Sequence, residues 1–262
     1  MFVLIVLHGQ FLFKGSNMTS TLEEHGRIRI NEGLIISVNR SFQVVHDRNQ
    51  RPVAAFKGIA HIGQNKNEDK NDVYQVTMAK NDSFWLGFDT DEEQVFAIIP
   101  CINGRQAITS TICQSPILEL DPKNFLIIPD QPWIDSIFVQ NEGYQQMVPE
   151  FATSASKKGR TAVKEIRLLI YLIDTKHNEV KSDNTNKPIP LYLNKNDDSI
   201  SNNSSHLWAS RSLANTSLPS KPNADLRFQI VEPEIFQTNT GIQLPSDSFK
   251  DQQNELPHNP FE

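Results

Sequence analysis

Hydrophobic and polar residues alternate along much of the first two thirds of the chain. The alternation is clearest in three short segments, whose hydrophobic positions are Ile28 and Ile30; Leu34, Ile36 and Val38; and Tyr74, Val76 and Met78. A period of two residues is typical of a β-strand with one buried face. Helical spacing is nowhere sustained, so we predict strands for these segments.

The dipeptide Asn103-Gly104 marks the clearest turn in the sequence. Apolar segments flank it at residues 95–99 and 106–112. Asparagine and glycine both accept the positive φ angles that a two-residue hairpin loop requires. We therefore predict a tight β-hairpin centred on this dipeptide.

Cys101 and Cys113 are the two cysteines of the chain. In a hairpin whose loop is Asn103-Gly104, Cys101 lies opposite Gln106 and not opposite Cys113, so we predict two free thiols in the core rather than a disulfide. Two cysteines can build a four-ligand zinc site only with help from histidines. The seven histidines show none of the close spacings of such a site, and we predict no metal.

Residues 166–173 are apolar on both faces, which favours a central strand covered on both sides. A helix of the same length remains an alternative, because periodicity does not separate the two in a short apolar run. Apolar runs recur along the chain with turn residues between them, as in a β-sandwich or a β-barrel. We predict one all-β domain over residues 26–175, an antiparallel sandwich or barrel-like fold.

The two ends of the chain differ from this domain. Residues 176–262 are rich in asparagine, serine and proline, and we predict that most of this tail is disordered. Two islands in the tail read as short strands, Leu226 to Val231 and the stretch from Ile235 to Leu244. Residues 1–25 are either an extension or the result of a miscalled start, with Met18 the true beginning; a strand and a signal or anchor are the alternatives.

The chain has 262 residues, of which 21% are charged, and a formal net charge of −6. This mildly acidic balance does not favour nucleic acid or an anionic membrane as a partner. The apolar stretch near the N-terminus is too short for a spanning helix and lacks the basic residues and cleavage site of a secretory signal. We predict a cytoplasmic protein, with secretion as the alternative.

Few motifs in the sequence indicate a catalytic or metal-binding function. The acidic stretch at residues 89–93 lacks the glycine and the distal glutamate of a calcium loop, so we interpret it as a solvated turn. The sequence has neither a Gly-x-Ser-x-Gly elbow nor a glycine-rich phosphate loop. We therefore nominate no catalytic residue and predict no cofactor.

Residues 129–135 are the most informative stretch, because Pro129 and Pro132 restrict the backbone around Trp133. Apolar segments precede and follow it, so we predict a rigid corner between two strands. A rigid aromatic beside the polar groups of Gln131 and Asp135 is the usual chemistry of a binding hot spot. The alternative is that Trp133 plugs the end of the core.

Two functions follow from this corner. The first is a non-enzymatic β-sandwich binding module whose partner, a protein or a small ligand, contacts Trp133, Asp135 and Gln131. The second is a hydrolase in which Asp130 and Asp135 converge in a cleft, since paired carboxylates can perform acid–base catalysis. We favour the binding module.

The segment from Ile127 to Ile137, together with Tyr144 to Val148, resembles the signature of a widespread family of uncharacterised proteins. In that family a Pro-x-Gln-Pro-Trp-(Ile/Leu)-Asp-Gly run is followed by an Arg-Gln-Phe-Val-Ala run. Here Ser136 replaces the glycine, and the arginine and phenylalanine of the second run are absent. The resemblance covers residues 120–173 and implies one ordered domain. The family has no assigned activity, so it implies no function.

Overall fold

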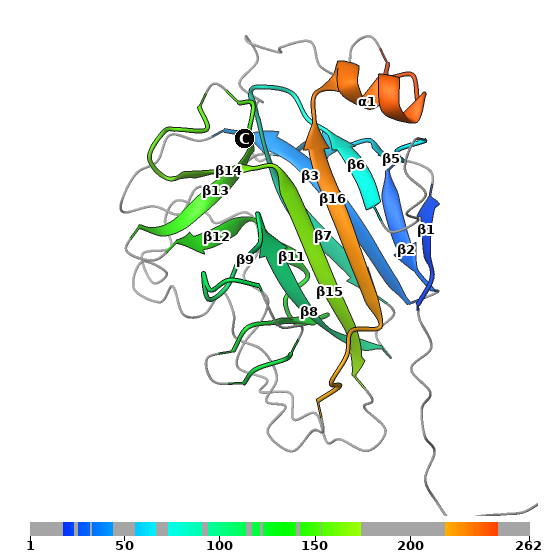
Figure 1. Cartoon of the computed structure of the whole chain (residues 1–262), viewed down its shortest axis with the longest axis vertical. Coiled ribbons are helices and arrows are strands. Elements are labelled where there is room, and N and C mark those ends of the chain that lie inside the picture. The colour runs from blue at the N-terminus through cyan, green and yellow to red at the C-terminus, as the bar shows by residue number, and fades with distance from the viewer. Residues whose placement is uncertain are drawn as a thin grey trace, which may run out of the picture.

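A computed structural model describes residues 18–23, 26–31, 33–43, 56–66, 73–90, 94–113, 117–120, 123–139, 142–152, 154–173 and 218–245. These residues form two β-sheets, A and B, that pack face to face as an open sandwich, with one short helix (Figure 1). The predicted all-β sandwich is confirmed. Most neighbouring strands are antiparallel, but two pairs, β13 with β14 and β16 with β6, are parallel.

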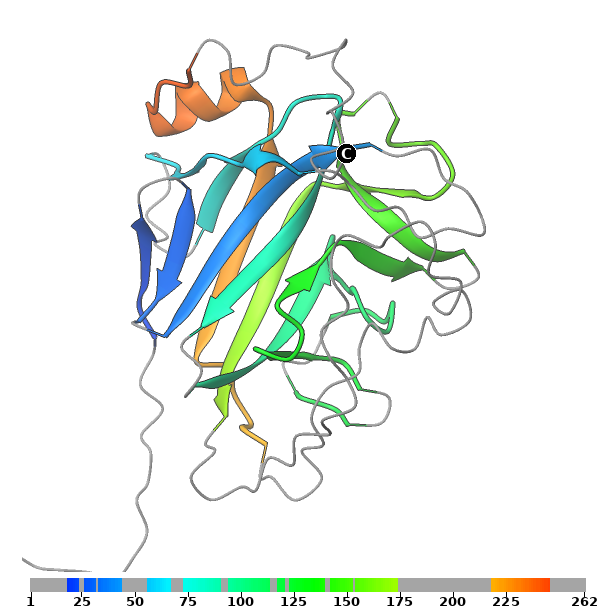
Figure 2. The same ribbon diagram turned by 180° about the vertical axis from the view of Figure 1, so that it is seen from behind.

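Sheet A lies behind sheet B in Figure 1 and in front of it in Figure 2. Its strands in the described residues are β1 (Ser20–Glu23), β2 (Arg27–Ile30), β3 (Leu34–Phe42), β4 (Phe56–Ile59), β7 (Asp82–Thr90), β11 (Trp133–Ile134), β12 (Ser136–Val139), β13 (Gly143–Pro149) and β14 (Arg160–Val163). The spatial order is β1-β2-β3-β7-β13-β12. In addition, β4 pairs with β3, β11 with β7, and β14 with β13.

Sheet B contains strands from the early, middle and late parts of the chain. Its described strands are β5 (Ile62–Gln64), β6 (Val73–Thr77), β8 (Val95–Ile102), β9 (Arg105–Gln106), β10 (Leu126–Ile128), β15 (Glu165–Ile173) and β16 (Ala224–Val231). Their order is β10-β8-β15-β16-β6-β5, and β9 pairs with β8. The helix α1 (Pro233–Thr240) follows β16 and contacts β5 and β6 at one end of the sandwich (Figure 1).

The main core lies between the two sheets and is built from alternate residues of the strands. The hydrophobic positions predicted in β2 and β3 are all buried in it, and so are Tyr74, Val76 and Met78. On β15, Ile166, Leu168 and Ile170 face this core. Leu169 and Tyr171 belong to a second hydrophobic cluster, which they share with Phe125 and Ile127. The central-strand interpretation of residues 166–173 is thereby confirmed.

The strand β6 is more deeply buried than its alternating sequence predicts. Gln75, on its other face, pairs with Gly63 of β5 and is also buried. A Cβ atom on Gly63 would lie 2.8 Å from side-chain atoms of Thr240 and Ile242. The segment at the end of α1 therefore lies over this face, and it buries a polar residue that a bare sheet would expose to solvent.

The folded unit continues past residue 175. Strand β16 lies between β15 and β6, near the middle of sheet B, which confirms the predicted strand at Leu226 to Val231. The second strand predicted between Ile235 and Leu244 is wrong, because this stretch forms α1. Pro233 stands at the start of the helix and Gly241 ends it with φ of 69°, the positions at which these residues favour helix boundaries.

Several sequence predictions lie outside the described residues. They are the N-terminal stretch 1–17, the acidic residues 91–93, and residues 176–217 and 246–262 of the predicted disordered tail.

The predicted hairpin is present at Asn103-Gly104. Both residues have positive φ angles, 48° and 78°, and Cys101 lies opposite Gln106 as expected. The Asn103 side chain also connects the hairpin to the segment between β14 and β15. Its Nδ2 donates to the carbonyl of Ala162, and its Oδ1 accepts hydrogen bonds from the backbone N–H groups of Lys164 and Glu165.

The prediction of two free thiols is wrong, because Cys101 and Cys113 form a disulfide with an S–S distance of 2.09 Å. Strand β9 is only two residues long, and the chain then turns back through Ser110, whose φ is 62°. The returning segment pairs with β9 through Ile112, and the N–H of Cys113 donates to the carbonyl of Gly104. This third pass brings Cys113 back beside Cys101, which a simple two-stranded hairpin does not do.

Replacing Asn103 with valine is expected to lower the free energy of unfolding by about 2 to 3 kcal/mol, because a β-branched residue resists positive φ and three hydrogen bonds are lost. Chemical denaturation measures the change. Asn103→Gly is the control, since glycine keeps the backbone angle and loses only the side-chain bonds. An Asn103→Val variant as stable as Asn103→Gly would show that the φ angle contributes nothing.

Candidate functional site

The corner at residues 129–135 carries the chain from one sheet to the other. Strand β10, just before it, pairs with β8 in sheet B, and β11, which it leads into, pairs with β7 in sheet A. The peptide bond between Ile128 and Pro129 is cis. The N–H of Gln131 donates to the carbonyl of Ile127, and the carbonyl of Pro132 accepts from Phe88. The predicted corner therefore joins two strands that belong to different layers.

Trp133 is only 8% exposed. It pairs with Gly87, while the next residue, Ile134, belongs to the core between the sheets. Successive side chains of a strand point to opposite faces, so the indole lies on the outer face of sheet A. Its Nε1 is buried, and no described residue accepts a hydrogen bond from it. This burial favours a packing role over an exposed anchor.

The other two residues predicted to bind at the corner make local contacts. Gln131 is also 8% exposed, and its Nε2 donates to the carbonyl of Trp133 at 3.0 Å. The carboxylate of Asp135 accepts a hydrogen bond from the Ser136 hydroxyl. The structure thus keeps the three predicted residues close together. The bonds of Gln131 and Asp135 fix the shape of the corner, and a role in binding stays a prediction.

Lys123 lies close to the start of the corner. Its Nζ is 5.2 Å from the centre of the Phe125 ring, a cation–π geometry. Burial lowers the pKa of Lys123 to about 8, and the charge of Asp130 opposes that shift. A small fraction of this amine is therefore uncharged at neutral pH.

A buried ion cluster connects three strands of sheet A. The Asp82 side chain is fully buried, and its carboxylate accepts from Arg40 Nε at 2.6 Å and Lys57 Nζ at 2.9 Å. The backbone N–H of Ala79 donates to the same carboxylate. Burial and the charge of Arg40 lower the pKa of His61, which keeps this imidazole neutral at pH 7. One carboxylate therefore pairs with two cations, one from β3 and one from β4.

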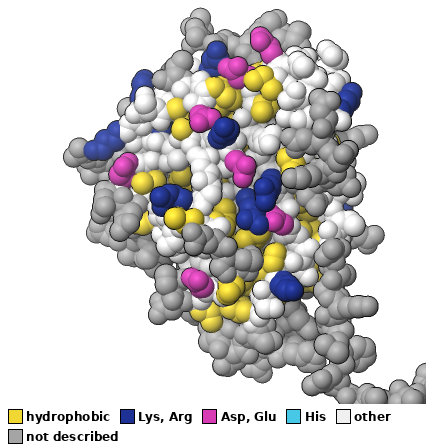
Figure 3. Space-filling model, viewed as in Figure 1, with side chains coloured by type: hydrophobic (Ala, Val, Ile, Leu, Met, Phe, Trp, Pro, Cys, Tyr) yellow, Lys and Arg dark blue, Asp and Glu magenta, His cyan; other side chains and the backbone are white. Residues whose placement is uncertain are grey.

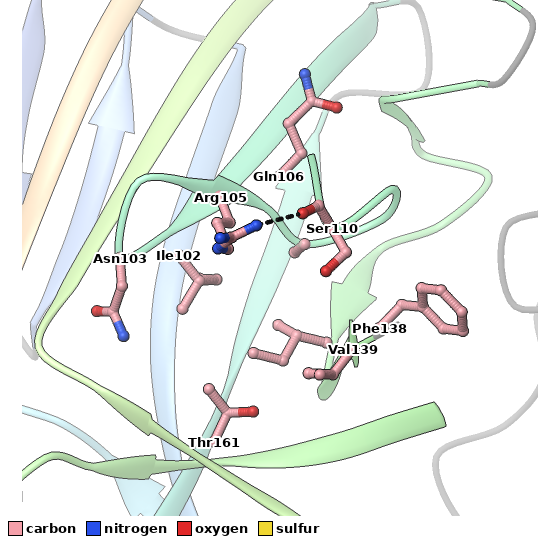
Figure 4. A pocket seen from close by; sticks show the side chains of 10 residues that line it. Ile102, Asn103, Arg105, Gln106, Ser110, Phe138, Val139 and Thr161 are labelled. Carbon is pink, nitrogen blue, oxygen red and sulfur yellow. Dashed lines mark hydrogen bonds between the residues drawn. The ribbon is translucent and has the colours of Figure 1, made fainter. Parts of the chain in front are cut away.

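A hollow of about 410 Å³ opens where the hairpin of sheet B meets β12 and β14 of sheet A. Figure 4 shows Arg105 and Ser110 on one side, Thr161 on the opposite side, and Ile102 and Val139 between them. The complete lining is Ile102, Asn103, Arg105, Gln106, Ala107, Ser110, Ile137, Phe138, Val139 and Thr161. Six of these ten residues lie within the loop closed by the Cys101–Cys113 disulfide.

The walls of the hollow are held by hydrogen bonds that leave few polar groups available. The side-chain amide of Asn103 is hydrogen-bonded to the backbone of Ala162 and Lys164. Thr161 Oγ1 donates to Gln145 Oε1 at 2.6 Å. Gln106 Oε1 accepts from the hydroxyls of Thr109 and Thr111. The N–H of Phe138 donates to the carbonyl of Ala107 and so connects β12 to the disulfide loop.

Among the described residues, Arg105 is the one charged residue that lines the hollow. One of its Nη atoms donates to the carbonyl of Ser110 at 3.1 Å, the dashed line in Figure 4. A guanidinium has five N–H groups, so the others remain available to a ligand. The Ser110 hydroxyl has no hydrogen-bond partner among the described residues. Neither Asp130 nor Asp135 lines the hollow.

None of the binding residues predicted from the sequence, Gln131, Trp133 and Asp135, lines this hollow. The signal that pointed to the region was Asn103-Gly104, which was interpreted only as a turn. The hollow itself needs the return of the chain at Ser110 and the approach of β12 from the other sheet. Neither event has a signature in the sequence of the hairpin.

The described part of the surface has mixed charge and no cluster of metal ligands. Acidic and basic side chains are interspersed over the face shown in Figure 3, without a large patch of one sign. In the described ranges, no three residues of the His, Cys, Asp and Glu types come together to hold a metal ion. The described part of the chain has α1 as its helix, and eight residues are too few to span a bilayer.

The fold and the hollow define a two-sheet β protein with a hollow that polar and apolar residues of both sheets line. Comparison with protein-family models, with curated proteins and with solved structures gives no match. The resemblance carried by residues 120–173 therefore stays a prediction.

Proposed function

We propose that the protein is a non-enzymatic binding module that holds a small ligand in the hollow beside Arg105. The observation that carries the proposal is the hollow itself, about 410 Å³ in volume and lined by residues of both sheets. Small-molecule sites commonly have volumes of about 300 to 1,000 Å³ and combine an apolar lining with a few placed polar groups.

The lining favours binding over hydrolysis. Hydrolysis by acid–base catalysis needs two groups that can exchange protons with the substrate. Of the described residues that line the hollow, Arg105 alone has an ionisable side chain, and a guanidinium does not exchange its proton in this way. The alternative is a hydrolase that uses Asp130 and Asp135 in a cleft. Neither residue lines the hollow, so the binding module remains the better proposal.

A fragment screen by two-dimensional NMR tests this function. The set contains anionic, neutral and cationic small molecules, and the readout is the shift of backbone amide signals. We expect at least one fragment to shift the signals of residues 102–110 and 137–139. Val139→Phe places a larger side chain at the hollow and is expected to abolish these shifts. Leu172→Phe, an exposed change on β15, is the matched control.

A screen without shifts at the hollow, or with shifts that survive Val139→Phe, would contradict the proposal. Melting curves of both variants accompany the screen. They separate loss of binding from loss of folding.

We also propose that the protein works in an oxidising compartment, which favours the secreted alternative over the cytoplasmic prediction. The Cys101–Cys113 disulfide supports this, because structural disulfides persist mainly outside the reducing cytosol. Thiol alkylation of the chain in acid-quenched extracts of its own cells is expected to label neither cysteine. Labelling of both would place the protein in a reducing compartment.

A further inference from the structure

The charge of the hollow comes from one side chain that is already oriented. Arg105 is held at its rim by the hydrogen bond to the carbonyl of Ser110, which limits the positions of the guanidinium. Arg105 is an exposed residue, and this bond lowers the cost of ordering its side chain when a ligand binds. Ordering a long side chain would otherwise oppose binding with an entropic cost.

The available polar groups of the hollow are mainly donors. Arg105 keeps N–H groups beyond the one bound to Ser110, and the Ser110 hydroxyl can donate as well. The amide oxygens in the lining are already engaged, since Asn103 Oδ1 and Gln106 Oε1 each accept two hydrogen bonds. The hydroxyls of Ser110 and Thr161 are the remaining side-chain acceptors. A ligand that fits this arrangement brings acceptors, and a negative charge on them strengthens the bonds.

Apart from Thr161, the rest of the lining is apolar. Ile102 and Ile137 contribute buried side chains of the main core, and Val139 packs against that core from β12. We infer that the hollow takes a small monocarboxylate with an apolar body, the carboxylate on Arg105 and the body against Ile102 and Val139. This inference rests on the binding function proposed above and specifies its ligand class.

Charge and solvation favour a carboxylate over inorganic phosphate. One guanidinium balances one negative charge, whereas a phosphate monoester or inorganic phosphate carries between one and two at neutral pH. The second charge would be left against apolar side chains, where an unpaired ion is strongly disfavoured. An apolar body also gains by leaving water, which phosphate does not.

Three probes of known structure test the inference by titration calorimetry. They are 3-phenylpropanoate, its neutral amide 3-phenylpropanamide, and inorganic phosphate. We expect the carboxylate to bind about tenfold more tightly than the amide, as for a charge-assisted hydrogen bond at a partly exposed site. Phosphate is expected to bind more weakly than the carboxylate. Added salt is expected to weaken the binding of the carboxylate and to leave the binding of the amide unchanged.

Arg105→Gln is the decisive variant, because it removes the charge and keeps a donor. It is expected to make carboxylate and amide bind equally. Arg27→Gln is the matched control: Arg27 is an exposed arginine on β2 that does not line the hollow, so the tenfold preference should persist.

The outcomes separate this inference from the proposed function. One outcome is that the parent protein binds the carboxylate and the amide equally and that Val139→Phe abolishes both. That result would keep the hollow as a binding site and overturn its preference for anions. A preference that survives Arg105→Gln would also overturn the inference. Absence of binding by all three probes, while fragments of another class bind at the hollow, would exclude small carboxylates and leave the binding function standing.

Discussion

Asp82→Asn is expected to lower the free energy of unfolding by about 3 to 5 kcal/mol, the usual cost of removing one partner from a buried ion pair. The carboxylate is fully buried and pairs with both Arg40 and Lys57, whose side chains are only 11% and 20% exposed. Asparagine fills the same space but leaves two cations without their counter-ion in a poorly solvated site. Chemical denaturation at constant pH measures the change.

Asp225→Asn is the matched control for this prediction. Asp225 also binds an arginine through two hydrogen bonds, to Arg167, but both side chains are about one-third exposed. Solvent screens such a pair, so the loss is expected to be about 1 kcal/mol or less. If both variants lose the same free energy of unfolding, burial does not make the Asp82 cluster more stabilising than the exposed pair.

Trp133→Ala is expected to destabilise the protein by about 3 to 5 kcal/mol, as for other large side chains removed from packed sites. The indole is 8% exposed, and the change would leave a cavity between the corner and the outer face of sheet A. Thermal and chemical denaturation measure the loss. An unfolding free energy within about 0.5 kcal/mol of the parent would instead identify Trp133 as a surface anchor.

Trp133→Phe separates packing from hydrogen bonding at the same position. The buried Nε1 has no acceptor among the described residues, and an unsatisfied donor is itself unfavourable. Phenylalanine removes this donor and keeps most of the ring, so we expect a much smaller loss than for alanine. Acrylamide quenching of a variant in which Trp85 and Trp208 are replaced provides an independent readout. Strong quenching of Trp133 would contradict its burial.

The local features of the fold could be predicted from the sequence because each depends on neighbouring residues. Ile28 and Ile30 alternate with polar residues, and that alternation alone determines which face enters the core. Asn103-Gly104 specifies its turn through backbone angles that few other residues accept. The apolar run of β15 favoured a strand buried on both sides, although a helix of the same length remained an alternative.

The features that were missed depend on contacts between distant segments. The disulfide requires the turn at Ser110, a non-glycine residue with positive φ that no turn signal announces. The ion cluster joins Arg40 to Asp82 across 42 positions, and nothing near either residue specifies the other. The hollow likewise exists only after β12 of one sheet reaches the hairpin of the other.

At the Trp133 corner, the bend depends on neighbouring residues and the environment of the indole depends on a distant strand. Its prolines made the bend predictable, because they act on their own backbone. The environment of the indole was not predictable, since it depends on β7 presenting Gly87 beside it. Period-two alternation also cannot tell which side of a two-residue strand faces the core. The sequence therefore located the corner correctly and left its role open between anchor and plug.

The insertion of β16 between β15 and β6 has a consequence for synthesis on the ribosome. Until residues 224–231 have been made, sheet B consists of two separate parts, and β15 and β6 each present an unpaired edge. Unpaired edges readily add strands from other chains. The nascent protein therefore carries both unpaired edges from the synthesis of β15 until that of β16, and chaperone protection during that interval is expected to raise the yield of native protein.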